Sequence, residues 1–310
     1  MAAIGALSAA VLLALDPYDT GRFALVAGAG VPAMGQRFVA ASLGRQGSVD
    51  TAIIGNSTLQ LVDPARLGAL SGGRAVSLTI PGSGPREQLA VAEWFRRHHP
   101  GAALRGVVIG IDASWCRGDG RLPLAHPFPF WLYAESAGAY ALGMLRLQSF
   151  EAAGRKVTLL LGRARPARPD GYDDFELGRR WDADAAAAQS PRSPALDARA
   201  GAAATDFAAV PLLRRFLAEL DPSTPVVLAM PPRHHHALPA PESAAAKAEQ
   251  ACKAAFATLA QQRPGTALVD FVDRPGMREN EMYWDLLHYR APVARAMEAE
   301  IAAAMVPETR

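Results

Sequence analysis

The sequence contains little cysteine and carries almost no net charge. Its 310 residues include two cysteines, Cys116 and Cys252, whose wide separation matches neither a zinc-binding nor a redox spacing. We expect two free, half-buried thiols, with a single disulfide as the alternative if the protein is exported. A formal net charge of +2 gives no reason to expect nucleic acid as a partner.

Long apolar runs are also missing, which leaves residues 1–15 as the one stretch with a membrane-like composition. This stretch ends at Asp16-Pro17, is short for a transmembrane span, and lacks the basic residues that open a signal peptide. Because it lies at the start of the chain, we expect a membrane anchor or an export signal rather than a buried helix. Residues 16–310 then form a single domain.

Short apolar segments alternate with helical stretches along most of the chain. The predicted strands are residues 51–54, 75–80, 106–111, 225–230 and 267–272. The predicted helices are residues 36–43, 87–99, 210–220, 243–261 and 291–305, with a further helix starting at Asp63-Pro64. Strand–turn–helix units repeated at roughly thirty-residue spacing are typical of an α/β fold with a parallel sheet. The glycines at 82 and 84 lack the patterns of nucleotide-binding loops, which disfavours that class.

Residues 117–205 interrupt this alternation. We expect an insertion or lid there, with a helix over residues 135–153 and a strand or helix end over residues 156–161. Residues 163–204 are polar and show little periodicity, which indicates irregular structure.

Ser57 follows the first strongly predicted strand, in the sequence Gly55-Asn56-Ser57. A serine at a strand-to-helix turn is held on rigid backbone beside free helix N–H groups, which suits a nucleophile whose attack creates an oxyanion. The alternative is structural, because Ser57 and Gln60 also fit the S-x-x-Q capping box.

Asp285 and His288 form a D-x-x-H motif after the last strand. A histidine supplies the base that a serine hydroxyl needs, and an aspartate fixes the imidazole tautomer. Loops that follow the carboxyl ends of parallel strands meet at one edge of the sheet. We therefore predict that Ser57, Asp285 and His288 form a catalytic triad. An aspartate–histidine contact that merely caps a helix is the alternative.

The order of these motifs resembles that of the SGNH (GDSL-like) hydrolases. The four matching blocks, in chain order, are Gly55-Asn56-Ser57, Ile80-Pro81-Gly82, Gly110-Ile111-Asp112 and Asp285-Leu286-Leu287-His288. The resemblance covers about residues 50–120 and 205–305. It implies a three-layer, flavodoxin-like α/β sandwich with a mostly parallel central sheet, to which residues 117–205 are an insertion.

The same resemblance implies an oxyanion hole built from the amides of Ser57 and Gly82, with residue 112 contributing. Two residues depart from the family pattern: Asn56 replaces the usual aspartate beside the nucleophile, and Asp112 replaces an asparagine. An ionised carboxylate would repel an oxyanion, so we favour a structural role for Asp112 over a place in the hole. Asn56 is also a candidate to bind substrate.

Three adjacent histidines, His234, His235 and His236, follow the fourth strand. Adjacent residues cannot all face one ion, and no cysteine or carboxylate lies at ligand spacing, so we expect neither a metal nor another cofactor. His234 is a candidate to contact substrate, with a solvated loop as the alternative.

Within the family, the nearest resemblance is to exported polysaccharide O-acyltransferases and D-alanyl transfer proteins. It implies a serine-dependent O-acyl esterase or O-acyltransferase that forms an acyl-enzyme on Ser57 and acts on an acylated carbohydrate or a small ester. The expected location is the periplasm or elsewhere outside the cytoplasm, with a membrane-bound acyl-donor protein as a partner. The competing hypothesis is an inactive subunit of the same fold that binds carbohydrate or assists assembly.

Overall fold

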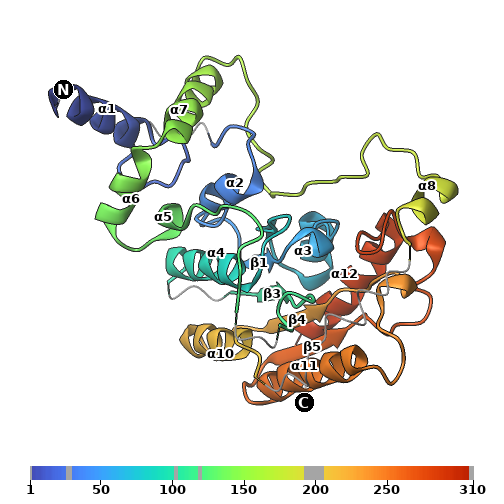
Figure 1. Cartoon of the computed structure of the whole chain (residues 1–310). Helices are drawn as coiled ribbons and strands as arrows, with labels where there is room; N and C mark the ends of the chain where they lie inside the picture. Colours follow the sequence, from blue (N-terminus) through green and yellow to red (C-terminus); the bar gives the residue numbers. More distant parts are fainter. Residues whose placement is uncertain (1, 26–29, 101–103, 118–120, 192–205, 307–310) are drawn as a thin grey trace.

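The centre of the molecule is a five-stranded sheet in which every pair of neighbouring strands is parallel (Figure 1). The structure is a computed structural model that describes residues 2–25, 30–100, 104–117, 121–191 and 206–306. The strand order is β2-β1-β3-β4-β5. The strands are β1 (Thr51–Ile54), β2 (Ala75–Ser77), β3 (Gly106–Gly110), β4 (Val226–Met230) and β5 (Thr266–Asp270).

Helices cover both faces of the sheet, which confirms the predicted three-layer α/β sandwich. Ile54 and Ile109 point into one core, whereas Ile53 and Val108 point into the other. The first core is covered by α2 (Gln36–Leu43), α4 (Pro85–His98), α10 (Ala209–Glu219) and α11 (Ala244–Gln261), and the second by α3 (Pro64–Ser71) and α12 (Ala291–Met305). Burial on both faces explains why β1 and β3 read as unbroken apolar runs.

The strands and helices predicted around this sheet are confirmed, and their ends move by only a few residues. The start of α3 has its expected cap, since the Asp63 carboxylate accepts a hydrogen bond of 2.9 Å from the amide of Ala65 and Pro64 takes the first helical position. Three short 3-10 helices lie in loops: η1 (Ser57–Leu59), η2 (His235–Ala237) and η3 (Asn280–Met282).

The predicted insertion holds several helices. Those in its described part are α5 (Phe130–Tyr133), α6 (Ala137–Met144), α7 (Leu147–Leu160) and α8 (Ala183–Ala188). The prediction of one helix over residues 135–153 is wrong, because Leu145 and Arg146 leave the helical conformation, with Arg146 extended at φ −120° and ψ 149°. Residues 156–160 belong to α7 and are a helix end rather than a strand. Residues 192–205 lie outside the described part of the chain.

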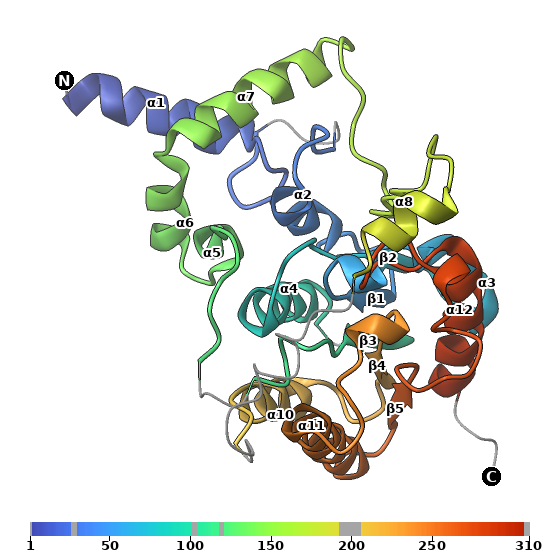
Figure 2. The same cartoon turned by 45° about the vertical axis from the view of Figure 1, so that its right-hand side comes forward.

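The apolar N-terminal stretch forms α1 (Ala2–Leu15), which contacts α6 and α7 at a distance from the sheet (Figure 2). Buried polar contacts join these segments. Lys156 on α7 forms a 3.4 Å ion pair with Asp19, and the Tyr140 hydroxyl on α6 donates a 3.1 Å hydrogen bond to Asp16. None of the helices that the structure describes is both long and apolar enough to cross a membrane.

Cys116 and Cys252 form a disulfide, so the prediction of two free thiols is wrong. Their Cα atoms lie 5.5 Å apart although 136 positions separate them in sequence. Cys116 follows β3, and Cys252 is buried within α11 against the same face of the sheet. The contact depends on the packing of α11, which residue spacing does not encode.

Candidate active site

The residues singled out in the sequence all follow the carboxyl ends of the strands. Ser57 follows β1, Gly82 follows β2, Asp112 follows β3, His234 follows β4, and Asp285 and His288 follow β5. In an open parallel sheet with this strand order, ligands bind where the chain connections run in opposite directions, which here is between β1 and β3. Ser57 lies at that position.

Ser57, His288 and Asp285 form a continuous hydrogen-bonded chain. The Nε2 atom of His288 lies 2.9 Å from the Ser57 hydroxyl oxygen, and its Nδ1 atom lies 2.7 Å from Oδ2 of Asp285. Because Nδ1–H donates to the carboxylate, Nε2 is left to accept the serine proton. The three side chains predicted as a triad are therefore in contact, although 231 positions separate Ser57 from His288.

The D-x-x-H motif also anchors its own loop. While Oδ2 of Asp285 holds the imidazole, Oδ1 accepts hydrogen bonds of 2.8 and 2.9 Å from the amides of Leu287 and His288. Partial burial alone would raise the pKa of Asp285. The hydrogen bonds from the His288 ring and from these two amides lower it by more than burial raises it, so the pKa lies below its ordinary value. Asp285 is therefore ionised at neutral pH and stabilises a protonated imidazole.

Ser57 and Gln60 do not form the capping box that their spacing allows. Asn56 caps η1 instead, because its Oδ1 atom accepts a 3.0 Å hydrogen bond from the amide of Thr58. The Gln60 side chain turns away and donates a 2.8 Å hydrogen bond to Asp173. The Ser57 hydroxyl is thus left for His288, and it is partly exposed to solvent.

Several neighbours that sequence analysis missed hold the triad in place. The Tyr289 hydroxyl donates a 2.5 Å hydrogen bond to the carbonyl of Thr58, which ties the histidine loop to the serine turn. Burial raises the pKa of Tyr289, so the phenol keeps its proton. From the insertion, the Phe175 ring meets the His288 ring edge-on, with 5.8 Å between centroids. Only Tyr289 had a local signal, its place beside His288.

Two backbone amides, those of Ser57 and Gly82, are the candidate oxyanion donors. Among the described residues, neither the Ser57 amide nor the Gly82 amide donates a hydrogen bond to another group. Gly82 has φ +69°, a conformation that favours glycine, and a Cβ atom there would lie 2.9 Å from the exposed His126 ring, which would have to shift. The following residue fastens this loop, since the Ser83 carbonyl accepts a 3.3 Å hydrogen bond from Asn56.

The two departures from the family pattern lie in contact with each other. Nδ2 of Asn56 donates a 2.6 Å hydrogen bond to Oδ2 of Asp112, and the Ser114 hydroxyl donates a 2.6 Å hydrogen bond to Oδ1. In the family pattern, the position of Asn56 holds a carboxylate and the position of Asp112 holds an amide. In this chain the two groups are exchanged. Asp112 is thus held by structural partners. Asn56 is buried, and its contact with substrate stays a prediction.

The exchange predicts the behaviour of an Asn56→Asp variant. Desolvation already raises the pKa of Asp112, and a second carboxylate beside it would raise that pKa further. When the pKa of a carboxyl group is higher in the folded than in the unfolded state, stability is greatest at acidic pH. It falls as the pH rises through the folded-state pKa. We expect a loss of about 1–3 kcal/mol at neutral pH, measured by chemical denaturation across pH.

The Asn56→Asp/Asp112→Asn double variant provides the control for that prediction. It restores one carboxylate and one amide, with the partners reversed, and we expect it to recover most of the lost free energy of unfolding. The inferred pairing would be contradicted if the double variant lost as much free energy of unfolding as the two single variants lose together.

His234 lies behind the site rather than on its surface. Its Nδ1 atom accepts a 3.0 Å hydrogen bond from the amide of His236, and its Nε2 atom lies 2.8 Å from Oδ1 of Asn280. The ring is buried, which lowers the pKa of His234 and keeps it neutral. Because its amide also donates to the Leu286 carbonyl at 3.2 Å, His234 holds the loop between Asp285 and His288, and its contact with substrate stays a prediction.

The three adjacent histidines come closer together than their spacing led us to expect. One ring nitrogen from each of His234, His235 and His236 lies within 4.8 Å of the others. Both nitrogens of His234 are engaged in hydrogen bonds within the chain, so a metal ion bound by all three would require His234 to give up one of them.

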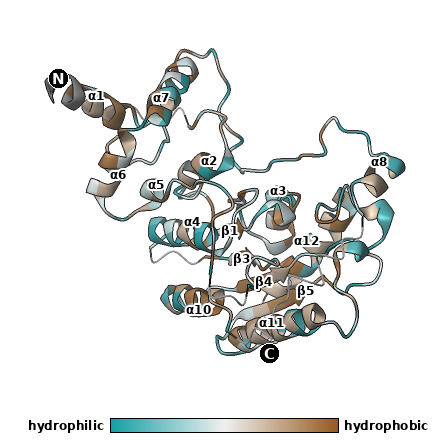
Figure 3. Cartoon of the chain, in the orientation of Figure 1, coloured by the Kyte–Doolittle hydropathy of each residue, from teal (hydrophilic) through white to brown (hydrophobic). Residues whose placement is uncertain are grey.

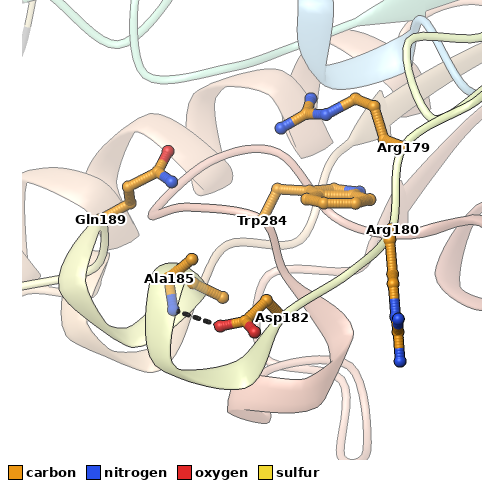
Figure 4. A pocket seen from close by; sticks show the side chains of 7 residues that line it. Arg179, Arg180, Asp182, Ala185, Gln189 and Trp284 are labelled. Atoms are coloured by element: carbon orange, nitrogen blue, oxygen red, sulfur yellow. Dashed lines mark hydrogen bonds between the residues drawn. The ribbon is translucent and has the colours of Figure 1, made fainter.

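A cavity of about 260 Å³ opens beside the triad loop (Figure 4). Its lining includes Trp284, which directly precedes Asp285, together with Arg179, Arg180 and the first turn of α8. The Arg179 guanidinium stacks on the Trp284 indole at 4.2 Å, and the indole N–H donates a 2.6 Å hydrogen bond to Glu176. The cavity therefore combines an aromatic ring with two cationic groups.

The chain matches no model of a known protein family and no curated protein sequence.

Proposed function

We propose that this protein is a serine-dependent O-acyl esterase or O-acyltransferase of the SGNH type, working through an acyl-enzyme on Ser57. The observation that carries the proposal is the 2.9 Å contact between the Ser57 hydroxyl and Nε2 of His288, with Asp285 holding the other ring nitrogen at 2.7 Å. A serine hydroxyl is a weak nucleophile at neutral pH, and this arrangement supplies the base that activates it.

The first half of the reaction transfers the acyl group to the enzyme. His288 takes the proton of the Ser57 hydroxyl as the serine oxygen bonds to the acyl carbon, and Asp285 stabilises the imidazolium. The resulting oxyanion accepts hydrogen bonds from the amides of Ser57 and Gly82. When the tetrahedral intermediate collapses, the bond to the alcohol oxygen breaks, and His288 returns the proton to that leaving oxygen.

The second half regenerates the serine. A water molecule or a second alcohol gives its proton to His288 and attacks the acyl carbon, and the Ser57 oxygen leaves with the proton that His288 returns. Water gives hydrolysis and an alcohol gives acyl transfer. Asp112 takes no part in the hole, because Asn56 and Ser114 engage both of its carboxylate oxygens.

An acylated carbohydrate is the substrate class that the surroundings of the triad support best. The exposed side chains of Arg179 and Arg180 offer hydrogen-bond donors in the cavity beside the triad loop, where the buried Trp284 ring stacks against Arg179. The disulfide between Cys116 and Cys252 supports a location outside the cytoplasm, because disulfides persist in oxidising compartments. A membrane-bound acyl-donor protein is the corresponding proposed partner for acyl transfer.

The test is acylation of the full chain by p-nitrophenyl acetate, followed by peptide mass spectrometry. We expect one acetyl group on Ser57 in the parent and none there in Ser57→Ala. Ser136→Ala, which removes an exposed hydroxyl at the start of α6, is the matched control and should be labelled on Ser57 like the parent. Absence of label on Ser57 in the parent would contradict the proposal and favour the inactive, binding subunit.

A further inference from the structure

Exposed apolar side chains gather on one part of the molecule, remote from the sheet. Among the described residues, eleven of the sixteen exposed large hydrophobic side chains lie within residues 2–25 and 137–161, which we call the apolar arm. They include Leu7, Val11, Leu142, Leu147, Phe150 and Leu161. The arm consists of α1, α6, α7 and the chain next to them, and it projects from the helical layers in Figures 1 and 2. Such a concentration indicates a binding surface rather than chance exposure.

Two helices of the apolar arm contain no charged residue at all. The sequence of α1 is AAIGALSAAVLLAL and that of α6 is AGAYALGM. Figure 3 shows both helices as predominantly hydrophobic. A helix that is apolar all round its circumference is stable in a protein core or in lipid. Neither helix is fully covered by other parts of the protein, because the side chains of Leu7 on α1 and Leu142 on α6 are exposed to solvent.

The apolar arm is fixed to the body of the protein and is not a loose tail. Asp19 accepts a 2.8 Å hydrogen bond from Ser42 on α2 and forms the ion pair with Lys156 on α7, whose side chain is buried. The hydrogen bonds and ion pair of Asp19 lower its pKa despite the opposing effect of burial, so the carboxylate is charged. These buried contacts hold the apolar surface in a defined orientation.

Exposed positive charge lies on α7 and in the chain directly before and after it. Arg146, Arg155, Arg163 and Arg165 are exposed, and between residues 146 and 165 the one acidic residue is Glu151. None of these four arginines forms an ion pair with another described residue. Guanidinium groups beside an apolar surface complement the phosphates of anionic lipids, and each contributes about tenfold or less to membrane partitioning.

We propose that the apolar arm docks on an anionic lipid bilayer, with its leucines among the outer acyl chains and its arginines at the phosphate headgroups. The exposed leucines lie on helices that pack on one another, α1 against α6 and α7, so contact with the outer part of one leaflet is the geometry that fits. This inference does not depend on the proposed function, because it uses no residue of the triad or its cavity.

The experiment is flotation of the full chain with protein-free vesicles of phosphatidylcholine, alone or mixed with phosphatidylglycerol. We expect the parent to float with both and more strongly with the mixture. Leu142→Glu/Leu147→Glu should lower the partition coefficient by at least about tenfold, because two exposed leucines can no longer enter lipid. Arg155→Gln/Arg163→Gln should weaken binding to the mixed vesicles and leave binding to phosphatidylcholine nearly unchanged.

The matched control is Leu70→Glu/Leu212→Glu, which adds the same charge at exposed leucines on α3 and α10. It should float like the parent. The proposal is overturned if the parent ignores both vesicle types, if Leu142→Glu/Leu147→Glu floats like the control, or if binding requires vesicles that contain a membrane protein. Unchanged thermal unfolding and Ser57 acetylation in each variant would separate lost membrane binding from misfolding and from failure of the enzymatic proposal.

Discussion

Replacing His288 with alanine is expected to lower kcat/KM for an activated acyl ester by about 10⁴-fold or more. The expected loss is large because, in the described part of the chain, the one side-chain hydrogen bond of the Ser57 hydroxyl is the 2.9 Å contact with Nε2 of His288. Asp285→Asn should cost about 10³–10⁴-fold, since an amide at that position no longer fixes the ring tautomer or stabilises the imidazolium.

The matched control for this prediction is His235→Ala. His235 is an exposed histidine on the neighbouring loop, and its Nδ1 atom meets the carbonyl of Arg278 at 3.2 Å. We expect its kcat/KM to stay within about twofold of the parent, because it does not contact the triad. Steady-state kinetics with each purified variant measure the effect. If His288→Ala kept more than a tenth of the parent activity, the base would have to be another group.

The triad could be predicted because its signals are local and its assembly follows from the fold. Apolar runs identify the strands, Gly55 and the D-x-x-H motif identify the loops, and parallel strands bring all their carboxyl ends to one edge. The resemblance to a known family then supplied the order of the blocks. Within each loop, however, the spacing allowed two interpretations, and only coordinates distinguish a cap by Asn56 from a cap by Ser57.

The features that sequence analysis missed depend on contacts between distant segments. The disulfide requires α11 to pack beside the loop after β3, and the pairing of Asn56 with Asp112 requires neighbouring strands to end at the same level. Each residue looked anomalous alone, whereas in the structure the two side chains form one hydrogen bond with each other. The break between α6 and α7 carries no glycine or proline at Leu145 and Arg146, and both residues are exposed, so neither local residue type nor burial marked it in the sequence.

A buried carboxylate behind the triad gives the second large expected effect. The side chain of Glu298 on α12 is fully buried, and its oxygens accept hydrogen bonds of 2.8 Å from the Asp63 amide, 2.5 Å from Arg295 and 2.9 Å from Arg66. Asp63 begins α3, shortly after the turn that carries Ser57. Glu298 therefore joins the C-terminal helix to the segment that follows the nucleophile.

Glu298→Ala is expected to lower the free energy of unfolding by about 2–4 kcal/mol. The loss comes mainly from the Asp63 amide, which would be left without an acceptor, and from the cavity that replaces the carboxylate; Arg66 is half exposed and contributes less because water can solvate it. Glu300→Ala, two positions further along α12, removes a partly exposed ion pair with Arg274 and should cost less than about 1 kcal/mol. Urea denaturation of both variants measures the difference. If both variants lost the same free energy of unfolding, the buried carboxylate of Glu298 would add no stability. The packing of α12 on α3 would then depend on apolar contacts alone.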